Sequence, residues 1–282
     1  MIDPTANDHA QVAAELRNVI ADVLELGGRT VMRHRGDATQ IAMKTSQADL
    51  VTSADLDSER EMIEFLQTKF PADAIISEEH GAMEGSSGRT WVIDPLDGTV
   101  NFAAGSPSFG VIVGLCDGDD AIAGGMFLPA SGDLFLGIKG HGATHNGVPL
   151  TPVSAHVSLA DALFDHSTLH YRDPARAAAQ LGTLTSLMAN ARGIRCDHSL
   201  RYLADVALGR LNGFVYHSLG LWDITGPSVI LGELGYQVTN LTGEPLDLSP
   251  SSWVNGRLYA AVGAEPQLLA EVIELLNAHE RS

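Results

Sequence analysis

The chain lacks several features that would place it in other classes of protein. No apolar run among its 282 residues is long enough to span a membrane, because Gly, Asp or Pro interrupts each of them. The N-terminal segment MIDPTANDHA has neither the basic nor the apolar region of a signal peptide, so we expect a cytoplasmic protein. Only two cysteines occur, Cys116 and Cys196, and there is no C-x-x-C motif. We therefore expect two reduced core cysteines, and no disulfide framework.

Basic residues are also few. The chain has 17 Lys and Arg against 35 Asp and Glu, which gives a formal net charge of −18. Binding to a nucleic-acid backbone needs a basic surface, so we expect no nucleic-acid partner, and the short apolar runs predict no membrane partner. An anionic substrate would be repelled at long range, so a metal ion or local Lys and Arg would have to reverse the field at its site.

What the chain has is a substantial core and a mixed pattern of helices and strands. Hydrophobic residues make up 45% of it and charged residues 18%, which indicates a folded protein. We expect two halves, residues 1–153 and 154–282, with a β-meander over 108–150. Amphipathic or buried helices are predicted at 9–33, 53–69, 173–191, 199–208, 225–234 and 265–278. Residues 80–89 are predicted to be a loop because they are rich in Gly and Ser.

The stretch WVIDPLDGTVNF, residues 91–102, carries the clearest chemical pattern. It predicts a short buried strand over 91–93, an acidic turn with Asp94 and Asp97, and a helix that begins at Thr99. Two carboxylates at a strand end can converge on a divalent cation, and the unpaired N–H groups of a helix start can bind phosphate. A metal-assisted phosphatase needs both. Taken alone, D-P-x-D-G is also ordinary turn chemistry, and that alternative stays open.

Three other segments place acidic residues next to the start of a helix or the end of a strand. They are DLVTSAD with Asp55, ISEE with Glu78 and Glu79, and LWD with Asp223. Asp55 also has an ordinary explanation, as a first-turn acid that complements the helix dipole. The adjacent glutamates could likewise be a solvated surface pair, since they repel each other unless water or a cation screens them.

Taken together, DLVTSAD, ISEE, WVIDPLDGTVNF and LWD resemble, in order and spacing, the motifs of the inositol monophosphatase family of magnesium-dependent, lithium-sensitive phosphatases. The resemblance runs from about Val12 to Ala278. It implies an α/β (α+β mixed) fold, a layered αβαβα sandwich of the inositol monophosphatase and fructose-1,6-bisphosphatase type. It also implies a homodimer, with most metal and phosphate ligands in the N-terminal half and the substrate-recognition residues in the C-terminal half.

The resemblance also implies roles for individual residues. Those that match the family's metal ligands are Glu78, Asp94, the main-chain carbonyl of Leu96, Asp97 and Asp223, which would hold two or three Mg²⁺ ions. Those that match its phosphate-binding helix start are Gly98, Thr99 and Val100. Those that match the group that orients and deprotonates the attacking water are Asp55, Thr99 and Glu78. Lys44 and Glu79 match loop residues of the site, and closure of the Lys44 loop would help to order metal and substrate.

Several positions depart from the family's pattern. The usual DGTTN is DGTVN here, so Val100 keeps its N–H but lacks a hydroxyl. Tyr216 stands where inositol-specific members carry a glutamate that grips substrate hydroxyls, and tyrosine offers only one O–H and a ring face. The usual Gly-Ser is His198-Ser199, and Arg201 follows. We expect Ser199, Arg201 and Tyr216 to bind substrate, although a solvated helix residue is the alternative for Arg201.

The chain is therefore predicted to be an enzyme, a Mg²⁺-dependent phosphomonoesterase that uses metal-activated water. The expected substrate is a small soluble phosphate ester, inositol 1-phosphate or a similar sugar-alcohol phosphate. Alternatives on the same scaffold are fructose-1,6-bisphosphatase, 3'(2'),5'-bisphosphate nucleotidase and histidinol-phosphatase. An alternative of another class is a non-catalytic metal-binding regulator. The complete set of acidic site residues argues against such a regulator, because a site that no longer catalyses a reaction has no physical need for paired carboxylates.

Overall fold

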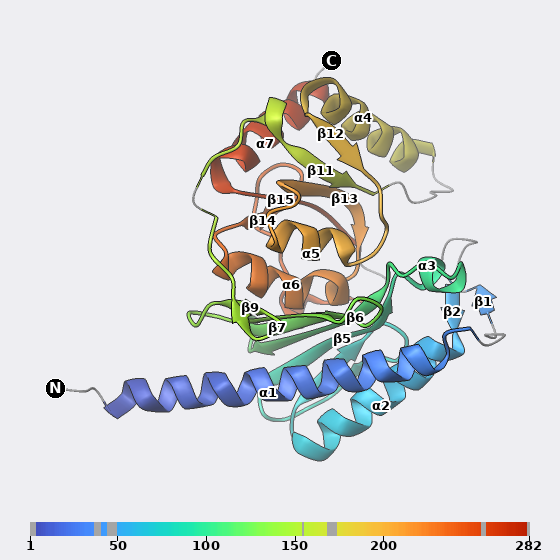
Figure 1. Cartoon of the computed structure of the whole chain (residues 1–282), viewed down its shortest axis with the longest axis vertical. Helices are drawn as coiled ribbons and strands as arrows, with labels where there is room; N and C mark the ends of the chain where they lie inside the picture. The colour runs from blue at the N-terminus through green and yellow to red at the C-terminus, as the bar shows by residue number, and fades with distance from the viewer. Residues whose placement is uncertain are drawn as a thin grey trace.

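A computed structural model of the protein describes residues 4–36, 41–43, 50–153, 155–167, 174–254 and 258–280. In this part of the chain two large sheets alternate with layers of helices, which confirms the predicted αβαβα sandwich (Figure 1). Helices α1 and α2 cover one face of the eight-stranded sheet, α5 and α6 lie between the two sheets, and α4 and α7 cover the outer face of the five-stranded sheet. The division at residue 153 stays a prediction.

The first layer contains α1 (Pro4–Arg33) and α2 (Ser53–Lys69). α1 begins earlier than the predicted residue 9, and its apolar face packs against the sheet and α2. α2 begins as predicted, because Thr52 caps it and Asp55 completes a capping box with the Thr52 backbone. A short ribbon of β1 (Ile41–Met43) and β2 (Leu50–Thr52) precedes α2.

The eight-stranded sheet has the order β10-β9-β8-β7-β6-β5-β3-β4. Its strands are β3 (Ala74–Ser77), β4 (Gly81–Met83), β5 (Arg89–Asp97), β6 (Gly110–Asp117), β7 (Asp120–Leu128), β8 (Asp133–Ile138), β9 (Ala143–His145) and β10 (Val148–Pro149). β3 runs parallel to β5 with Ser77 opposite Ile93. This register sets Glu78 and Asp94, the next residues of the two strands, at one edge of the sheet.

Two predictions about this sheet were wrong. β4 lies inside the segment predicted to be a loop, because Gly81–Met83 pairs with β3 despite its weak strand pattern. β5 is longer than residues 91–93 and continues past a bulge to Asp97. The bulge, between Asp94 and Asp97, lets both carboxylates lie at the same end of the strand.

The five-stranded sheet has the order β12-β11-β13-β15-β14. Its strands are β11 (Leu163–His166), β12 (Gly193–Arg195), β13 (Gly213–Leu219), β14 (Gln237–Thr239) and β15 (Tyr259–Ala264). The remaining helices are α3 (Thr99–Ala103), α4 (Pro174–Asn190), α5 (Arg201–Ala207), α6 (Leu221–Glu233) and α7 (Pro266–Glu280), with short turns η1 (Leu159–Asp161) and η2 (Pro250–Ser252). α6 begins before the predicted residue 225, so Asp223 lies in its first turn and not ahead of it.

α6 reaches the eight-stranded sheet closely because glycines face each other at the contact. A Cβ on Gly124 would lie 2.4 Å from the Cα of Gly226, and a Cβ on Gly226 would lie 2.3 Å from the carbonyl oxygen of Val113. Only glycine fits both places. Asp223 lies one turn before Gly226, so this close packing carries its carboxylate to the end of β5.

The described residues also bear on the two cysteines and on membrane-spanning helices. Cys116 and Cys196 are both outside disulfides, as predicted, but only Cys116 is buried. The expectation of a core position for Cys196 was wrong, because it follows the edge strand β12 on the surface. None of the helices in the described ranges combines the length and the apolar composition needed to cross a bilayer.

Candidate active site

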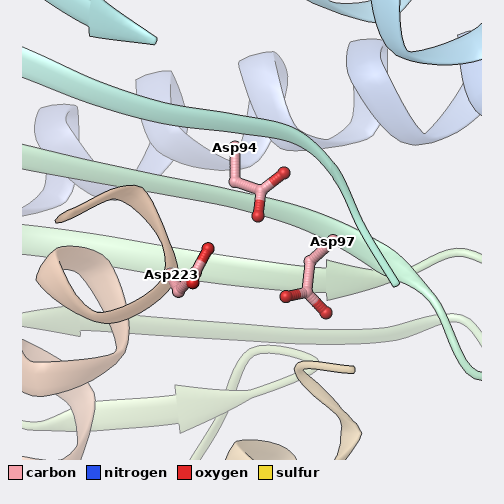
Figure 2. Close-up of side chains that lie close together, drawn as sticks. All are labelled: Asp94, Asp97 and Asp223. Atoms are coloured by element: carbon pink, nitrogen blue, oxygen red, sulfur yellow. The ribbon is translucent and has the colours of Figure 1, made fainter. Parts of the chain in front are cut away.

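Three carboxylates converge between the end of β5 and the start of α6. Asp94 and Asp97 come from the end of β5 and Asp223 from the first turn of α6, and one oxygen of each lies within 4.8 Å of the others (Figure 2). Backbone N–H groups hold them. The N–H of Leu96 donates to Asp94 Oδ1 at 3.0 Å, and the N–H of Gly220 donates to Asp223 Oδ2 at 2.7 Å. The Asp97 carboxylate accepts the N–H of Leu200.

Burial and mutual repulsion make this cluster electrostatically unfavourable on its own. Desolvation, and then the charges of Glu78, Asp97 and Asp223, raise the pKa of Asp94 well above its ordinary value. Desolvation and the charge of Asp223 do the same to the pKa of Asp97. A divalent cation would remove this repulsion, and an all-oxygen ligand set suits a hard ion such as Mg²⁺. The donor chemistry of the three residues therefore fits a metal site.

Glu78 lies beside this cluster, in the turn that follows β3. Its N–H donates to the carbonyl oxygen of Ile93 at 3.3 Å, which extends the pairing of β3 with β5 by one residue. Its charge contributes to the raised pKa of both Asp94 and Asp97. Glu79 follows in the same turn, and its N–H donates to Glu59. The charge of Glu78 therefore acts on Asp94 and Asp97, and its predicted role as a metal ligand stays a prediction.

Asp55 and Thr99 form a hydrogen-bonded pair next to the cluster. Thr99 Oγ1 lies 2.9 Å from Asp55 Oδ1 and 3.0 Å from the carbonyl oxygen of Leu96, so its single proton can go to either acceptor. Asp55 is fully buried, and its other oxygen accepts the N–H and the hydroxyl of Thr52 at 2.8 and 2.5 Å. The carboxylate is therefore fixed with one oxygen toward Thr99.

The predicted phosphate-binding residues form the start of the short helix α3. Gly98 is its N-cap, with φ of 80° in the left-handed region, and a Cβ there would lie 2.9 Å from both the Ser108 carbonyl oxygen and the Ser199 Cβ. Only glycine meets both conditions. Thr99 and Val100 follow as the first two helical residues, whose N–H groups have no partner within a helix. Val100 is 44% exposed, so this end of α3 is open to a ligand.

Ser199 and Tyr216 lie buried, with their hydroxyls bonded within the protein. Ser199 Oγ donates to Asp197 Oδ1 at 2.6 Å and lies 2.8 Å from Ser108 Oγ. Tyr216 donates to Asp165 Oδ1 at 2.8 Å, and its ring stacks on Tyr202 with centroids 4.1 Å apart. These positions leave little of either side chain for a substrate, and their predicted role stays a prediction.

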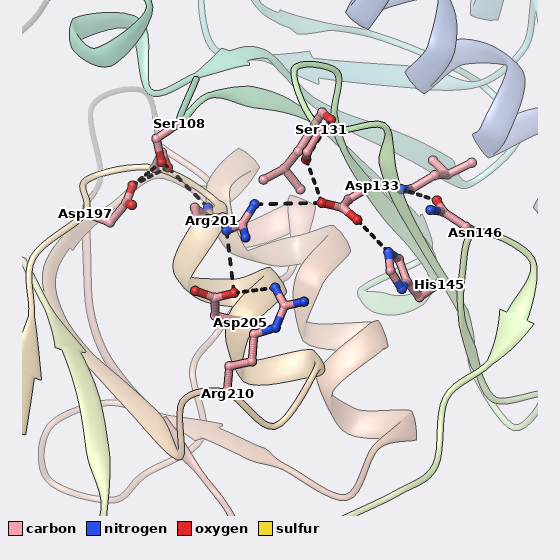
Figure 3. A network of polar contacts seen from close by, with 12 residues as sticks. Ser108, Ser131, Asp133, His145, Asn146, Asp197, Arg201, Asp205 and Arg210 are labelled. Atoms are coloured by element: carbon pink, nitrogen blue, oxygen red, sulfur yellow. Dashed lines mark hydrogen bonds and ion pairs between the residues drawn. The ribbon is translucent and has the colours of Figure 1, made fainter. Parts of the chain in front are cut away.

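Arg201 lies in a network of ion pairs (Figure 3). Its Nη1 is 3.8 Å from Asp133 Oδ2 and its Nε is 3.5 Å from Asp205 Oδ1. Asp205 also pairs with Arg210 and Arg195, and Asp133 pairs with His145. The structure thus places Arg201 between two carboxylates of its own chain. Its predicted contact with substrate stays a prediction, and Lys44 lies outside the described residues.

Sequence reasoning missed two buried acids near the site, Glu59 and Asp165. Glu59 is 5% exposed and holds the turn around Glu78. Asp165 is 1% exposed and accepts the Tyr216 hydroxyl, and burial raises its pKa to about 6. Glu59 had one usable signal, because it lies four residues after Asp55 on the same face of a helix. No comparable pattern marks Asp165.

Comparisons with known proteins agree with this geometry. Residues 11–281 match the sequence model of the inositol monophosphatase family. The chain is 30% identical to human inositol monophosphatase 2 over 97% of both chains, and 30% identical to the Nus factor SuhB of Pasteurella multocida over 98% of this chain and 97% of that one. Among solved structures, the extragenic suppressor protein suhB of Bartonella henselae superposes with a TM-score of 0.84 at 27% identity, over 93% of this chain and 98% of that chain.

Proposed function

Since the chain belongs to the inositol monophosphatase family, we propose that it is a Mg²⁺-dependent phosphomonoesterase. Its substrate would be a small soluble phosphate ester such as inositol 1-phosphate or a related sugar-alcohol phosphate. The observation that carries this proposal is the convergence of Asp94, Asp97 and Asp223 within 4.8 Å, in surroundings that raise the pKa of the first two. Such a cluster is suited to bind a divalent cation, and a bound cation can assist the hydrolysis of a phosphate ester.

The residues that would hold the metal are Glu78, Asp94, the carbonyl of Leu96, Asp97 and Asp223. Mg²⁺ bound there would neutralise the phosphate charge and lower the pKa of a water molecule, which suits the hydrolysis of an otherwise inert ester. The number of ions, two or three, belongs to the proposal.

The pair of Asp55 and Thr99 would orient and deprotonate the attacking water. Thr99 Oγ1 can accept a proton from water as it passes its own proton to Asp55 Oδ1, 2.9 Å away. Attack of the oxygen on phosphorus then breaks the P–O bond to the alcohol. The departing alkoxide takes a proton from solvent water and Asp55 returns its proton to solvent, so the products are inorganic phosphate and the free alcohol. The Asp55 carboxylate suits this role because Thr52 holds it in one orientation.

The start of α3 would bind the non-bridging oxygens of the phosphate. Gly98, Thr99 and Val100 provide backbone N–H groups at the positive end of the helix dipole. Val100 replaces a threonine of the family's pattern, so the side chain adds no hydrogen bond and the main chain alone would make the contact.

The surroundings of Arg201 favour a monophosphate over a bisphosphate. A second phosphate would need a cation of its own, and Arg201, the candidate from the sequence, already faces Asp133 and Asp205. Asp197 adds negative charge on the C-terminal side of the site, since its charge contributes to the raised pKa of both Asp97 and Asp165. A neutral alcohol is therefore the favoured leaving group.

A second candidate is a regulator that keeps the fold and binds a partner, and the name of the Pasteurella multocida relative, a Nus factor, favours it for that protein. The paired carboxylates of Asp94 and Asp97 favour catalysis here. Their repulsion destabilises the folded protein unless a metal ion binds between them, so a site that bound no metal would have no use for both. A homodimer, a cytoplasmic location and inhibition by Li⁺ also belong to our proposal.

Phosphate release across a panel of esters tests the proposal. The panel would contain inositol 1-phosphate, glycerol phosphate, histidinol phosphate, fructose 1,6-bisphosphate and 3'-phosphoadenosine 5'-phosphate, each with Mg²⁺, with EDTA and with added Li⁺. We expect Mg²⁺-dependent, Li⁺-inhibited release that is fastest with a monophosphate of a neutral alcohol. A folded, Mg²⁺-binding protein that releases no phosphate from any of them would support the regulator instead.

A further inference from the structure

One face of α2 contacts the end of β5, the start of α3 and the turn after β3, all of which carry residues of the site. Asp55, Ser58 and Glu59 share this face and are 0%, 0% and 5% exposed. Asp55 accepts the hydroxyl of Thr99, and Ser58 Oγ donates to the carbonyl oxygen of Pro95 at 2.9 Å, between Asp94 and Leu96. Glu59 contacts the turn that contains Glu78. The first contact belongs to the proposed reaction, whereas the Glu59 contact has no assigned role.

Glu59 gathers three donors from this turn on a single carboxylate oxygen. Its Oε1 accepts the N–H of Glu79 at 3.0 Å, the N–H of His80 at 3.0 Å and the hydroxyl of Ser77. Ser77 precedes Glu78, and Glu79 and His80 follow it. The carboxylate therefore grips the chain on both sides of Glu78.

Hydrogen bonds hold the chain on both sides of Glu78, and Glu59 accepts those on the side away from the sheet. On the sheet side, the N–H of Glu78 donates to the carbonyl oxygen of Ile93 and so continues the pairing of β3 with β5. Beyond Glu78 the chain turns back toward β4, and the N–H groups of Glu79 and His80 would lose these bonds without Glu59. Burying a carboxylate is costly unless charge-assisted bonds of this kind compensate for it.

We propose that Glu59 is a positioning residue that fixes the turn around Glu78 and so holds Glu78 in place to bind the divalent cation. The proposal rests on the metal site of the proposed function, and it adds a residue that touches neither metal nor substrate. Outer groups that orient a metal ligand typically change metal affinity by 10- to 100-fold when they are removed.

Calorimetric titration of the metal-free protein with Mg²⁺ tests this role without any substrate. In Glu59→Ala we expect at least a tenfold loss of Mg²⁺ affinity. In Glu59→Gln we expect a loss of no more than about threefold, because the amide oxygen still accepts the same bonds although the charge is gone. The matched control is Glu64→Ala, which removes an exposed carboxylate from the same helix and should leave the affinity unchanged.

Hydrogen exchange of the metal-free protein provides a second readout. The amides of Glu79 and His80 should exchange at least tenfold faster in Glu59→Ala than in the wild type, and at the wild-type rate in Glu64→Ala. If Glu59→Ala does not fold, Glu59→Asp replaces it. The shorter side chain keeps the charge but withdraws the oxygen from the two N–H groups, so the same two changes are expected.

Each outcome bears on the proposal. Wild-type Mg²⁺ affinity in Glu59→Ala would overturn it and leave the proposed phosphatase activity standing. An equal loss in Glu59→Gln and Glu59→Ala would also overturn it, because charge and not positioning would then be the cause. Conversely, a wild-type protein that binds Mg²⁺ but releases no phosphate would remove the proposed function and keep this role. A wild-type protein that binds no Mg²⁺ would contradict both.

Discussion

The carboxylates at the end of β5 differ from those around Arg201 in what surrounds them. Asp94 and Asp97 face other carboxylates, and both desolvation and those charges raise their pKa. Asp205 lies 3.2 Å from Arg210 and 3.5 Å from Arg201 (Figure 3). Arg195 lies 3.1 Å from the same carboxylate. Both groups consist of carboxylates, but the first faces other carboxylates and the second faces arginine side chains.

The pKa of Asp133 shows the same contrast. Burial pushes its pKa upward, but hydrogen bonds from Ser131 and His145 and the charges of His145 and Arg201 outweigh burial, so the pKa is lowered. The chain thus supplies cations for the acidic groups around Arg201. Around Asp94 and Asp97 it gathers further acidic groups, which is the arrangement expected where an external cation completes the structure.

The largest expected effect comes from a substitution at the centre of the unneutralised cluster. Asp94→Asn should lower kcat at least about 1,000-fold, because it removes a ligand that the metal cannot replace. The metal-free variant should melt no lower than the wild type, since the substitution removes a repelling charge. Phosphate release and thermal unfolding followed by circular dichroism measure the two quantities.

The matched substitution in the neutralised group should behave in the opposite way. Asp133→Asn should keep kcat within about threefold and lower the free energy of unfolding by about 1 to 2 kcal/mol, because it weakens bonds to His145 and Arg201. Wild-type turnover in Asp94→Asn, or lost turnover in a folded Asp133→Asn, would break the distinction between the two groups.

The proton-transfer pair should give the next largest effect. Thr99→Val should lower kcat by about 100- to 1,000-fold, because the variant side chain cannot pass a proton to Asp55. Thr99→Ser, which keeps the hydroxyl, should retain most of the activity. Steady-state kinetics at saturating Mg²⁺ separate the two, and equal rates in both variants would exclude Thr99 as the link between water and Asp55.

The dependence of stability on pH should differ with and without metal. A raised pKa in the folded state means that Asp94 and Asp97 favour folding below about pH 4, where both are protonated in either state, and lose that contribution as the pH rises through their folded pKa values. The lowered pKa of Asp133 works in the other direction. Mg²⁺ should therefore raise the melting temperature more at pH 8 than at pH 5, and an equal rise at both would contradict the raised pKa values.

The smallest expected effect is at Arg201. Arg201→Gln should change kcat and KM for a monophosphate by less than about threefold and lower the free energy of unfolding by about 0.5 to 1 kcal/mol, as for a partly exposed ion pair. Kinetics with inositol 1-phosphate and urea unfolding provide the test. A tenfold rise in KM would show that Arg201 leaves its ion pairs to bind substrate.

Site residues that lie close together in the sequence could be predicted more readily than those that are far apart. Asp94, Asp97 and Thr99 stand in one strand–turn–helix motif, so their chemistry could be read from twelve consecutive residues. Asp223 is far along the chain, and only the family resemblance joined it to them. The start of α6 was missed because Gly220 caps the helix without a side-chain bond, so no capping residue marks it.

Side-chain environments set by tertiary packing could not be predicted. The sequence places Arg201 at the start of a helix. The orientation of its side chain depends on Asp133, which lies in β8 of the eight-stranded sheet. The stacking of the Tyr216 ring on Tyr202 and the bond from its hydroxyl to Asp165 also join residues far apart in the sequence, and its predicted role in substrate binding stays a prediction. A single glutamate in an amphipathic helix resembles a surface residue, which is why Glu59 went unnoticed.

The most direct test of the central claim is a crystal structure with Mn²⁺ as a substitute for Mg²⁺, recorded for anomalous scattering. We predict at least one anomalous peak within about 2.3 Å of carboxylate oxygens of Asp94, Asp97 and Asp223, and none near Asp133 or Asp205. No peak at the end of β5, or a peak among the carboxylates around Arg201, would contradict the account.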